Sequence, residues 1–180
     1  MVLAFHSDAS FLSETGARSR AGGHMFMSEN DPFPKNNGAV LSVSQIIKAV
    51  MSSAAKAELG GLYINAREAV PARITLQEMG HPQPPTPAQT DNTMAHGVVT
   101  NKIQPRRTKA MDMRLHWLRC RENQEQFRFY WRDGAMNLGD YPSKHHAAAH
   151  HRNMRPEFLT PTQHLTELRK RKAIQNGQAA

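Results

Sequence analysis

The order in which strand-type and helix-type patterns follow one another is the feature that most restricts the fold. Strand-type segments come first, at residues 2–5, 24–28 and 38–46. A helical pattern over residues 51–69 follows, in which small and apolar residues recur at spacings of three to five. Strand-type segments at 88–92 and 127–131 then alternate with helical ones at 94–99 and 106–124. This order predicts an α/β fold with a mixed sheet covered by helices.

Glycine and proline predict where these elements are interrupted. The segment 13–23 is rich in glycine and serine, and it is predicted to be a turn. Pro71 is predicted to end or kink the first helix, and a second short helix over 72–80 would close on Gly80. Residues 81–87 contain prolines without N–H donors, so they are predicted to form a stiff linker rather than a central strand.

The charge balance favours a polyanionic partner. The chain has 23 Lys and Arg against 15 Asp and Glu, a net charge of +8. Basic groups that meet phosphates release condensed counterions, although the same excess can also serve solubility alone. Cys120 is the only cysteine, and no stretch reaches the roughly 20 apolar residues of a membrane span. We therefore expect an intracellular protein, cytoplasmic or nuclear, without a membrane partner.

Four acidic residues occupy positions where such a sheet gathers reactive groups. Asp8 and Asp91 are predicted at strand ends, Glu58 in the helix between them, and Asp140 at the opening of a late helix. Four converging carboxylates would repel one another unless cations neutralised them, and Mg²⁺ prefers oxygen ligands. Two such ions can cleave a phosphodiester by activating a water and stabilising the leaving oxygen. From spacing alone the signal is weak, and acids scattered over a solvated surface are the more common explanation.

Five segments in sequence resemble those of one known family. The first segment is HSDAS together with the RSRAGGHMFM that follows it. The second segment is MSSAAKAELGGLYINAREAV. The others are QTDNTMAHGVVTN, RRTKAMDMRLHWLR and NLGDYPSK. In this order and with these gaps they resemble the ribonuclease H domain of copia-type LTR retrotransposon polyproteins, over roughly residues 1–144.

This resemblance implies a fold and an activity. The fold is ribonuclease H-like, a five-stranded mixed sheet flanked by helices. The activity is endonucleolytic hydrolysis of the RNA strand of an RNA–DNA hybrid, leaving a 3′-hydroxyl, with reverse transcriptase as the neighbouring domain in the parent polyprotein. Two Mg²⁺ ions, or Mn²⁺, would be held by the catalytic residues Asp8, Glu58, Asp91 and Asp140.

The chain departs from the family pattern around the fourth acid. Gly139 stands where the family usually has alanine, and Pro142 lies where the family's helix continues. Proline is tolerated in a first helical turn, so Asp140 keeps its place as an N-cap if the helix begins at Tyr141, and otherwise the fourth ligand is displaced. These departures leave two interpretations: an active ribonuclease, or an inactive retroelement remnant that at most binds nucleic acid non-specifically.

Basic and polar residues offer candidate contacts to nucleic acid. The long predicted helix carries a row of basic residues that either contacts phosphates or is a solvated face. A hybrid would be recognised by groove shape and by its 2′-hydroxyls. The candidate contacts are Ser10, Asn92, Arg106, Arg107, Lys109 and Arg114.

Residues 145–180 are predicted to be a basic, His-rich helical extension or tail. His145, His146, His150 and His151 lie near its start and allow either a zinc site or simply a helical extension of the domain. A last amphipathic helix is predicted from Thr160 onward. His6 lies two residues before Asp8, hence on the same strand face, as a proton shuttle or a packed residue.

Overall fold

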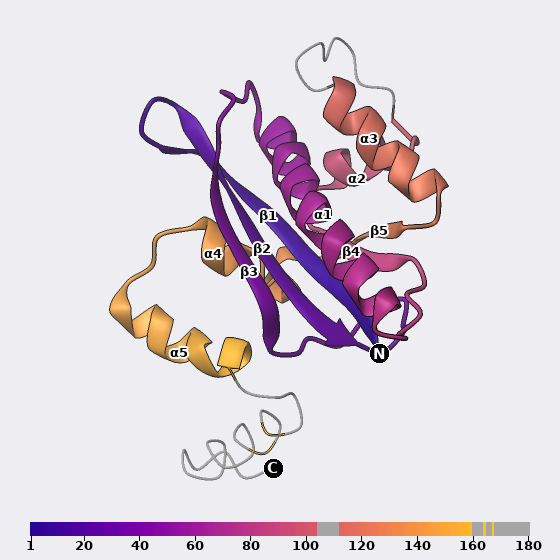
Figure 1. The fold of residues 1–180 in the computed structure, drawn as a ribbon. Helices are drawn as coiled ribbons and strands as arrows, with labels where there is room; N and C mark the ends of the chain where they lie inside the picture. Colours follow the sequence, from indigo (N-terminus) through magenta and orange to yellow (C-terminus); the bar gives the residue numbers. More distant parts are fainter. Residues whose placement is uncertain (104–111, 160–163, 165–166, 168–180) are drawn as a thin grey trace.

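The computed structural model describes residues 1–103, 112–159, 164 and 167, and within them the chain forms one five-stranded sheet (Figure 1). The strands lie in the order β3-β2-β1-β4-β5. Antiparallel pairs join β1 to β2 and β2 to β3, whereas β4 runs parallel to β1 and to β5. The predicted five-stranded mixed sheet is therefore confirmed. The strand bounds are β1 Val2–Glu14, β2 Arg18–Ser28, β3 Ala39–Ile47, β4 Thr86–Thr90 and β5 Phe127–Trp131.

Helices cover the sheet from both sides (Figure 1). The long helix α1 lies across β1 and β2, with α2 and α3 beside it, while the short helix α4 packs on β2, β1 and β3. No helix among the described residues is both long and apolar enough to cross a membrane. The helix bounds are α1 Ala54–Glu78, α2 Thr93–Val99, α3 Asp112–Asn123, α4 Asp140–Ser143 and α5 Ala148–Leu159, with a 3₁₀ turn at Gly134–Met136.

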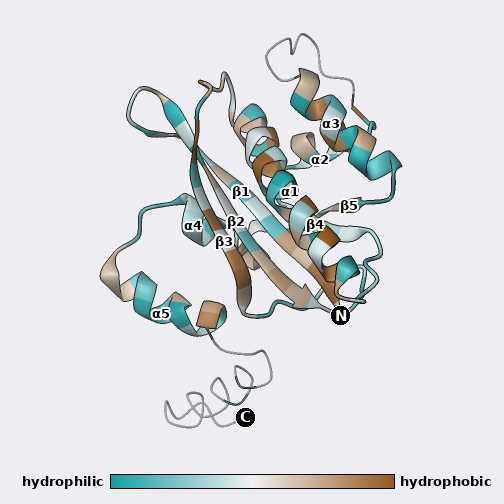
Figure 2. Cartoon of the chain, viewed as in Figure 1, coloured by the Kyte–Doolittle hydropathy of each residue, from teal (hydrophilic) through white to brown (hydrophobic). Residues whose placement is uncertain are grey.

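The main core lies between the sheet and α1. Leu62 of α1 is fully buried with Phe5 of β1 and the almost fully buried Phe127 of β5, and the two phenylalanine rings meet edge to face at 5.9 Å. Hydropathy colouring follows this division, with apolar stretches along the strands and largely hydrophilic residues on α5 (Figure 2). The catalytic candidates thus stand on a sheet that is fixed by its own apolar packing.

Two adjacent glycines in β2 let helices approach both faces of the sheet closely. A Cβ on Gly23 would lie 1.8 Å from Oδ1 of Asn65 in α1, whereas a Cβ on Gly22 would lie 2.2 Å from the carbonyl oxygen of Gly139, just before α4. Successive strand residues point to opposite faces, so the pair serves α1 and α4 separately. Gly22 pairs with Asp8 across the β1–β2 ladder, which places this close approach beside the first candidate carboxylate.

The interruption predicted at Pro71 is wrong, because α1 continues through this residue to Glu78. The helix begins at the Ser53 cap, whose side chain accepts from the N–H of Lys56, and Gly80 follows its end with a φ of +85°. Proline removes one hydrogen bond, but Ala69 and Arg73 are buried on either side of it. Tertiary packing of both halves therefore overrides the local preference.

Pro87 corrects a second expectation, because it lies inside β4, an interior strand, and not in a linker. The N–H of the preceding Thr86 donates to Gln126 beside β5, at 2.9 Å. Since successive N–H groups point to opposite sides of a strand, the missing donor of Pro87 faces β1. Pairing with β1 is registered only at Ala88 and Gln89, so the proline costs the ladder little.

The predicted turn over residues 13–23 is also too long. Only residues 15–17 form the turn, and β2 already begins at Arg18. Gly16 and Ala17 adopt left-handed conformations there, with φ of +69° and +53°. The glycines that suggested a longer turn are required for the close contacts of β2 instead.

We expect Gly23→Ala to lower the free energy of unfolding by about 2–3 kcal/mol, because the new methyl group would overlap the buried Asn65 amide. Urea denaturation followed by circular dichroism measures this change. Gly38→Ala is the matched control, since its Cβ would meet only an ordinary contact at 3.6 Å. Equal midpoints for the two variants would contradict the proposed packing role.

Candidate metal centre

The structure brings together three of the four predicted acidic residues. Asp8 lies within β1, Glu58 in the second turn of α1, and Asp91 directly after β4. One carboxylate oxygen from each lies within 4.8 Å of the other two. Among the described residues no other group of three acidic, histidine or cysteine side chains is arranged closely enough to hold a metal ion.

Neighbouring elements bind the carboxylates of Glu58 and Asp8 and anchor the backbone of Asp91. Glu58 Oε1 accepts from the backbone N–H of Ala9 at 3.2 Å, and Ser143 of α4 donates its hydroxyl to Oδ2 of Asp8. The indole N–H of Trp131 donates to the backbone carbonyl of Asp91 at 2.8 Å, which fixes the end of β4. The carboxylates are therefore positioned before any ligand arrives.

Burial and mutual repulsion make the charged forms of these acids costly. The pKa of Glu58 is raised to about 9, chiefly because burial penalises its anion and further because Asp8 and Asp91 lie nearby. Burial also raises the pKa of Asp8, against the hydrogen bond from Ser143, and with the help of Asp140 and Asp91. Burial is likewise the main reason that the pKa of Asp91 is raised. A bound cation would remove this cost by favouring all three charged forms.

The donor set fits a hard divalent cation. All three side chains offer carboxylate oxygens, which Mg²⁺ and Mn²⁺ accept as ligands. Glu58 is 8% exposed, and its Oε2 is buried without a hydrogen-bond partner in the described part of the chain. Buried polar atoms are rarely left without a partner, so this oxygen is available as a ligand for a cation.

Asp140 lies near this group but does not belong to it. It is the first residue of α4, whose cap is Gly139, so the condition that the helix begin at Tyr141 with Asp140 as its cap is not met. Its carboxylate binds the ammonium group of Lys144, one turn further on. Asp140 is nevertheless close enough to raise the pKa of Asp8 and Asp91 electrostatically.

The segment before α4 is bonded directly to β1. The N–H of Leu138 donates to Nδ1 of His6 at 3.1 Å, and the side-chain amide of Asn137 donates to the carbonyl of Ser7 at 2.9 Å. A Cβ on Gly139 would lie 3.1 Å from the backbone nitrogen of Asp8. The lack of a side chain at Gly139 therefore lets the start of α4 lie very close to the backbone of Asp8.

His6 is a packed residue in this arrangement. It is fully buried, and burial, aided by His24 and Arg132, lowers its pKa to about 3. Its Nδ1 accepts a backbone hydrogen bond, which requires the neutral ring. The structure thus assigns His6 to holding the segment before α4 rather than to shuttling protons.

The candidate nucleic-acid contacts are only partly described. Ser10 donates its hydroxyl to the carbonyl of Ser143 at 2.7 Å, and Asn92 caps α2 by accepting from Ala95 at 2.9 Å. Both residues therefore flank the carboxylates with structural roles of their own. The guanidinium group of Arg114 lies over the ring of Tyr63 at 5.6 Å. Arg106, Arg107 and Lys109 lie outside the described residues.

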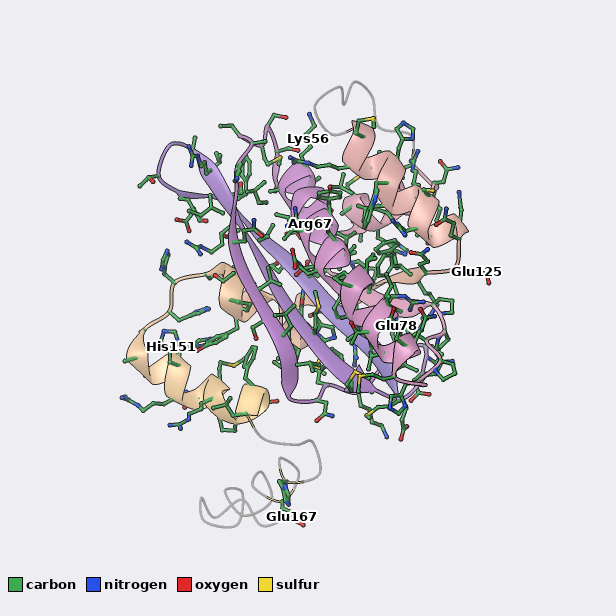
Figure 3. All side chains as sticks on the ribbon, in the orientation of Figure 1. Lys56, Arg67, Glu78, Glu125, His151 and Glu167 are labelled. Carbon is green, nitrogen blue, oxygen red and sulfur yellow. The ribbon has the colours of Figure 1, made fainter. Side chains whose placement is uncertain are left out.

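The His-rich segment forms an aromatic cluster around Tyr141. The rings of His146 and His150 stack at 4.2 Å, and His151, which is labelled on α5 in Figure 3, meets the hydroxyl of Tyr141 at 2.5 Å. These side chains do not form a group of three metal ligands. Residues Ala148–Leu159 are helical, as expected for an extension of the domain, whereas most of the last predicted helix lies outside the described residues.

Sequence reasoning missed the residues that hold the carboxylates in place. Ser143 and Trp131 carry no recognisable motif, and their roles depend on contacts across 135 and 40 residues. Lys144 follows Asp140 by four residues, a spacing at which helical side chains meet, and this was the one available signal.

Comparison with known proteins supports the fold. No family model matches the chain, and no curated protein matches it either. Among solved structures it is similar to the N-terminal RNase H domain of a Mycobacterium tuberculosis protein, with a TM-score of 0.52 and 15% identity over 78% of this chain and 89% of that one. It is also similar to LC11-RNase H1 isolated from compost by a metagenomic approach, with a TM-score of 0.56 and 8% identity over 78% and 91%.

A further similar structure is that of LC11-RNase H1 in complex with an RNA/DNA hybrid, with a TM-score of 0.51 and 9% identity over 77% of this chain and 91% of that one. Identities this low establish the fold alone. The chain therefore has the ribonuclease H-like fold, with an acidic group at the junction of β1, α1 and β4.

We expect the metal-free Glu58→Gln variant to be more stable than the metal-free unaltered protein, by a margin that grows as the pH rises. The folded-state pKa of Glu58 is about 9 and its ordinary value is 4.5, so folding takes up a proton between these values. The stability of the unaltered protein should therefore fall as pH rises through this window, a loss that glutamine avoids. By pH 8.5 the melting temperature of the variant should exceed that of the unaltered protein by about 3–6 °C.

Thermal melts in EDTA from pH 5 to 8.5 measure this difference. Glu78→Gln replaces an exposed carboxylate at the far end of the same helix, labelled in Figure 3, and should leave the profile unchanged. If the melting temperatures of Glu58→Gln and of the unaltered protein changed in parallel with pH, ionisation of the buried Glu58 would not destabilise the fold.

Proposed function

We propose that this chain is a divalent-metal-dependent ribonuclease that hydrolyses the RNA strand of RNA–DNA hybrids, derived from the polyprotein of a copia-type retrotransposon. The observation that carries this proposal is the convergence of Asp8, Glu58 and Asp91 within 4.8 Å on a ribonuclease H-like fold. The retrotransposon origin rests on the five sequence segments described above, and it implies a reverse transcriptase domain as partner and a cytoplasmic or nuclear location.

The residues present fit a two-ion mechanism. Bound divalent ions would supply an activated water and stabilise the leaving oxygen of the phosphodiester. Asp8 and Asp91 would each provide a carboxylate ligand, while Glu58 would contribute its buried Oε2. Ser143 and the N–H of Ala9 would keep Asp8 and Glu58 oriented, which preserves the geometry between turnovers.

The substrate class rests on charge and on resemblance. A net charge of +8 favours a nucleic acid over neutral substrates, because phosphate contacts release counterions. The similar LC11-RNase H1 has a structure in complex with an RNA/DNA hybrid. We propose that Ser10 and Asn92, adjacent to the carboxylates, contact the hybrid, and that Arg106, Arg107, Lys109 and Arg114 contact its phosphates.

We expect the protein to cleave a labelled RNA–DNA hybrid with Mg²⁺ or Mn²⁺, and Asp91→Asn to reduce the rate by roughly 100-fold or more. Losing one group that stabilises charge in a transition state has a cost of this size. Gel analysis of the labelled RNA strand measures the rate. RNA–RNA and DNA–DNA duplexes of the same sequence should remain intact.

Two controls separate chemistry from folding and contamination. Glu78→Gln changes an exposed carboxylate to an amide outside the site and should retain full cleavage. Asp91→Asn should still bind the hybrid, because it removes a ligand and not a basic contact. Cleavage by Asp91→Asn at the unaltered rate would exclude the assigned mechanism.

The second candidate function is non-specific nucleic-acid binding without turnover. The observation that favours it is that Asp140 is paired with Lys144 and is not part of the group formed by the other three acids. An inactive remnant would bind hybrid and DNA duplexes alike, with an affinity that falls steeply with salt. Binding without cleavage at every concentration of Mg²⁺ and Mn²⁺ would favour this function over the nuclease.

A further inference from the structure

Lys144 is a basic residue whose charge acts on all three carboxylates of the group. It follows α4 as its C-cap, and its Nζ binds Oδ1 of Asp140 one turn earlier. Its neighbour Ser143, the last residue of α4, donates its hydroxyl to Asp8, so Lys144 directly follows a residue that contacts the trio. The Lys144 side chain is 49% exposed and that of Asp140 37%, which leaves both free to exchange partners.

The charge of Lys144 acts on every acid of the site. It lowers the pKa of Asp8, Glu58 and Asp91, against the larger effect of burial at each. In return, Asp140, Asp8 and Asp91 raise the pKa of Lys144 despite its partial burial. Lys144 is therefore a charged ammonium within electrostatic range of the whole group.

Other basic side chains near these elements have different partners. Lys56 lies two residues before Glu58, but its ammonium binds the hydroxyl of Ser52 at 2.8 Å, and Figure 3 shows it near the start of α1. Arg20 binds Glu14 at 2.6 Å and also Ser44. Unlike Lys56 and Arg20, Lys144 binds Asp140, an acid that lies beside the carboxylate trio.

We propose that Lys144 is an internal counter-ion that holds Asp140 away from the carboxylate trio and competes with a divalent cation for it. This inference rests on the proposed function, because it assigns Asp140 as a ligand that becomes available only on exchange. A carboxylate that binds an ammonium group through one oxygen must give up that contact, or share it against charge repulsion, to bind a divalent cation. Lys144 is in this sense a positioning residue for the fourth ligand.

The competition has a specific consequence for the two cations. The trio of Asp8, Glu58 and Asp91 can bind one cation with the Lys144–Asp140 pair intact. A second cation needs Asp140 and must displace Lys144, so its binding is selectively weakened. Removing the charge of Lys144 should therefore tighten the weaker of two binding events more than the stronger one.

The test is a Mn²⁺ titration of the protein, followed by calorimetry and by electron paramagnetic resonance of free Mn²⁺. Lys144→Met keeps a long apolar stem without the charge and should tighten the weaker site about tenfold. Lys144→Arg retains the charge and should resemble the unaltered protein. Lys56→Met removes a lysine whose partner is Ser52 and should change neither site.

A double-mutant cycle with Asp140→Asn assigns the effect to the pair. If Lys144 acts through Asp140, the tightening by Lys144→Met disappears in the Asp140→Asn background. Equal tightening in both backgrounds, or weaker binding by Lys144→Met alone, would overturn the proposal. Circular dichroism of each variant checks that the fold is retained.

The outcomes distinguish this inference from the proposed function. Two Mn²⁺ sites with no difference between Lys144→Met and the unaltered protein would refute the inference and leave the nuclease proposal intact. Tightening without any hybrid cleavage would support the inference while refuting the nuclease. Absence of Mn²⁺ binding in every variant would refute both.

Discussion

The close packing of two helices against opposite faces of one glycine pair is the constraint on which the site depends. Gly22 and Gly23 face α4 and α1 respectively, and any side chain at either position would collide with backbone or with Asn65. Because Gly22 lies beside Asp8, this thin part of the sheet lets Ser143 reach the Asp8 carboxylate from one face. On the other face, Asn65 donates to the hydroxyl of Ser7 and to the carbonyl of Gly22, which ties α1 to both strands.

The same close packing buries the three carboxylates and so raises the free energy of their charged forms. Three carboxylates held in a buried junction repel one another, and burial raises their pKa values. The fold tolerates this cost because the apolar core beside it is extensive and because Lys144 supplies a positive charge at the rim. Such an arrangement stores unfavourable free energy that a divalent cation releases on binding, so stability and metal binding are thermodynamically linked.

The order of strands and helices along the chain, and the mixed sheet that follows from it, can be predicted from the sequence. Alternating strand and helix patterns predicted the mixed sheet, and strand positions placed Asp8 and Asp91 close to each other and to Glu58. Local rules failed where tertiary contacts decide. Pro71 continues a helix because both of its flanks are buried, and Pro87 occupies an interior strand because its missing N–H faces an unpaired stretch. Propensity describes a single segment and cannot include such neighbours.

The fourth acid shows the same limit at the level of the site. Its position in the sequence matched the family pattern, yet the start of α4 one residue earlier makes Asp140 a helical residue with Lys144 as partner. Side-chain partners such as Ser143 and Trp131 depend on segments far apart along the chain, which no local pattern reveals. The sequence thus predicted the three carboxylates that come together, but it also included Asp140 and gave no sign of what holds the group in place.

The hydroxyl contact from Ser143 to Asp8 spans 135 positions of the chain. During synthesis β1 leaves the ribosome before α4, so Asp8 acquires this partner only after α4 has emerged. At a rate of about 5–20 residues per second, that interval lasts on the order of ten seconds. Until then Asp8 lacks the hydroxyl that orients its carboxylate, so the acidic group is complete only after α4 has been synthesised.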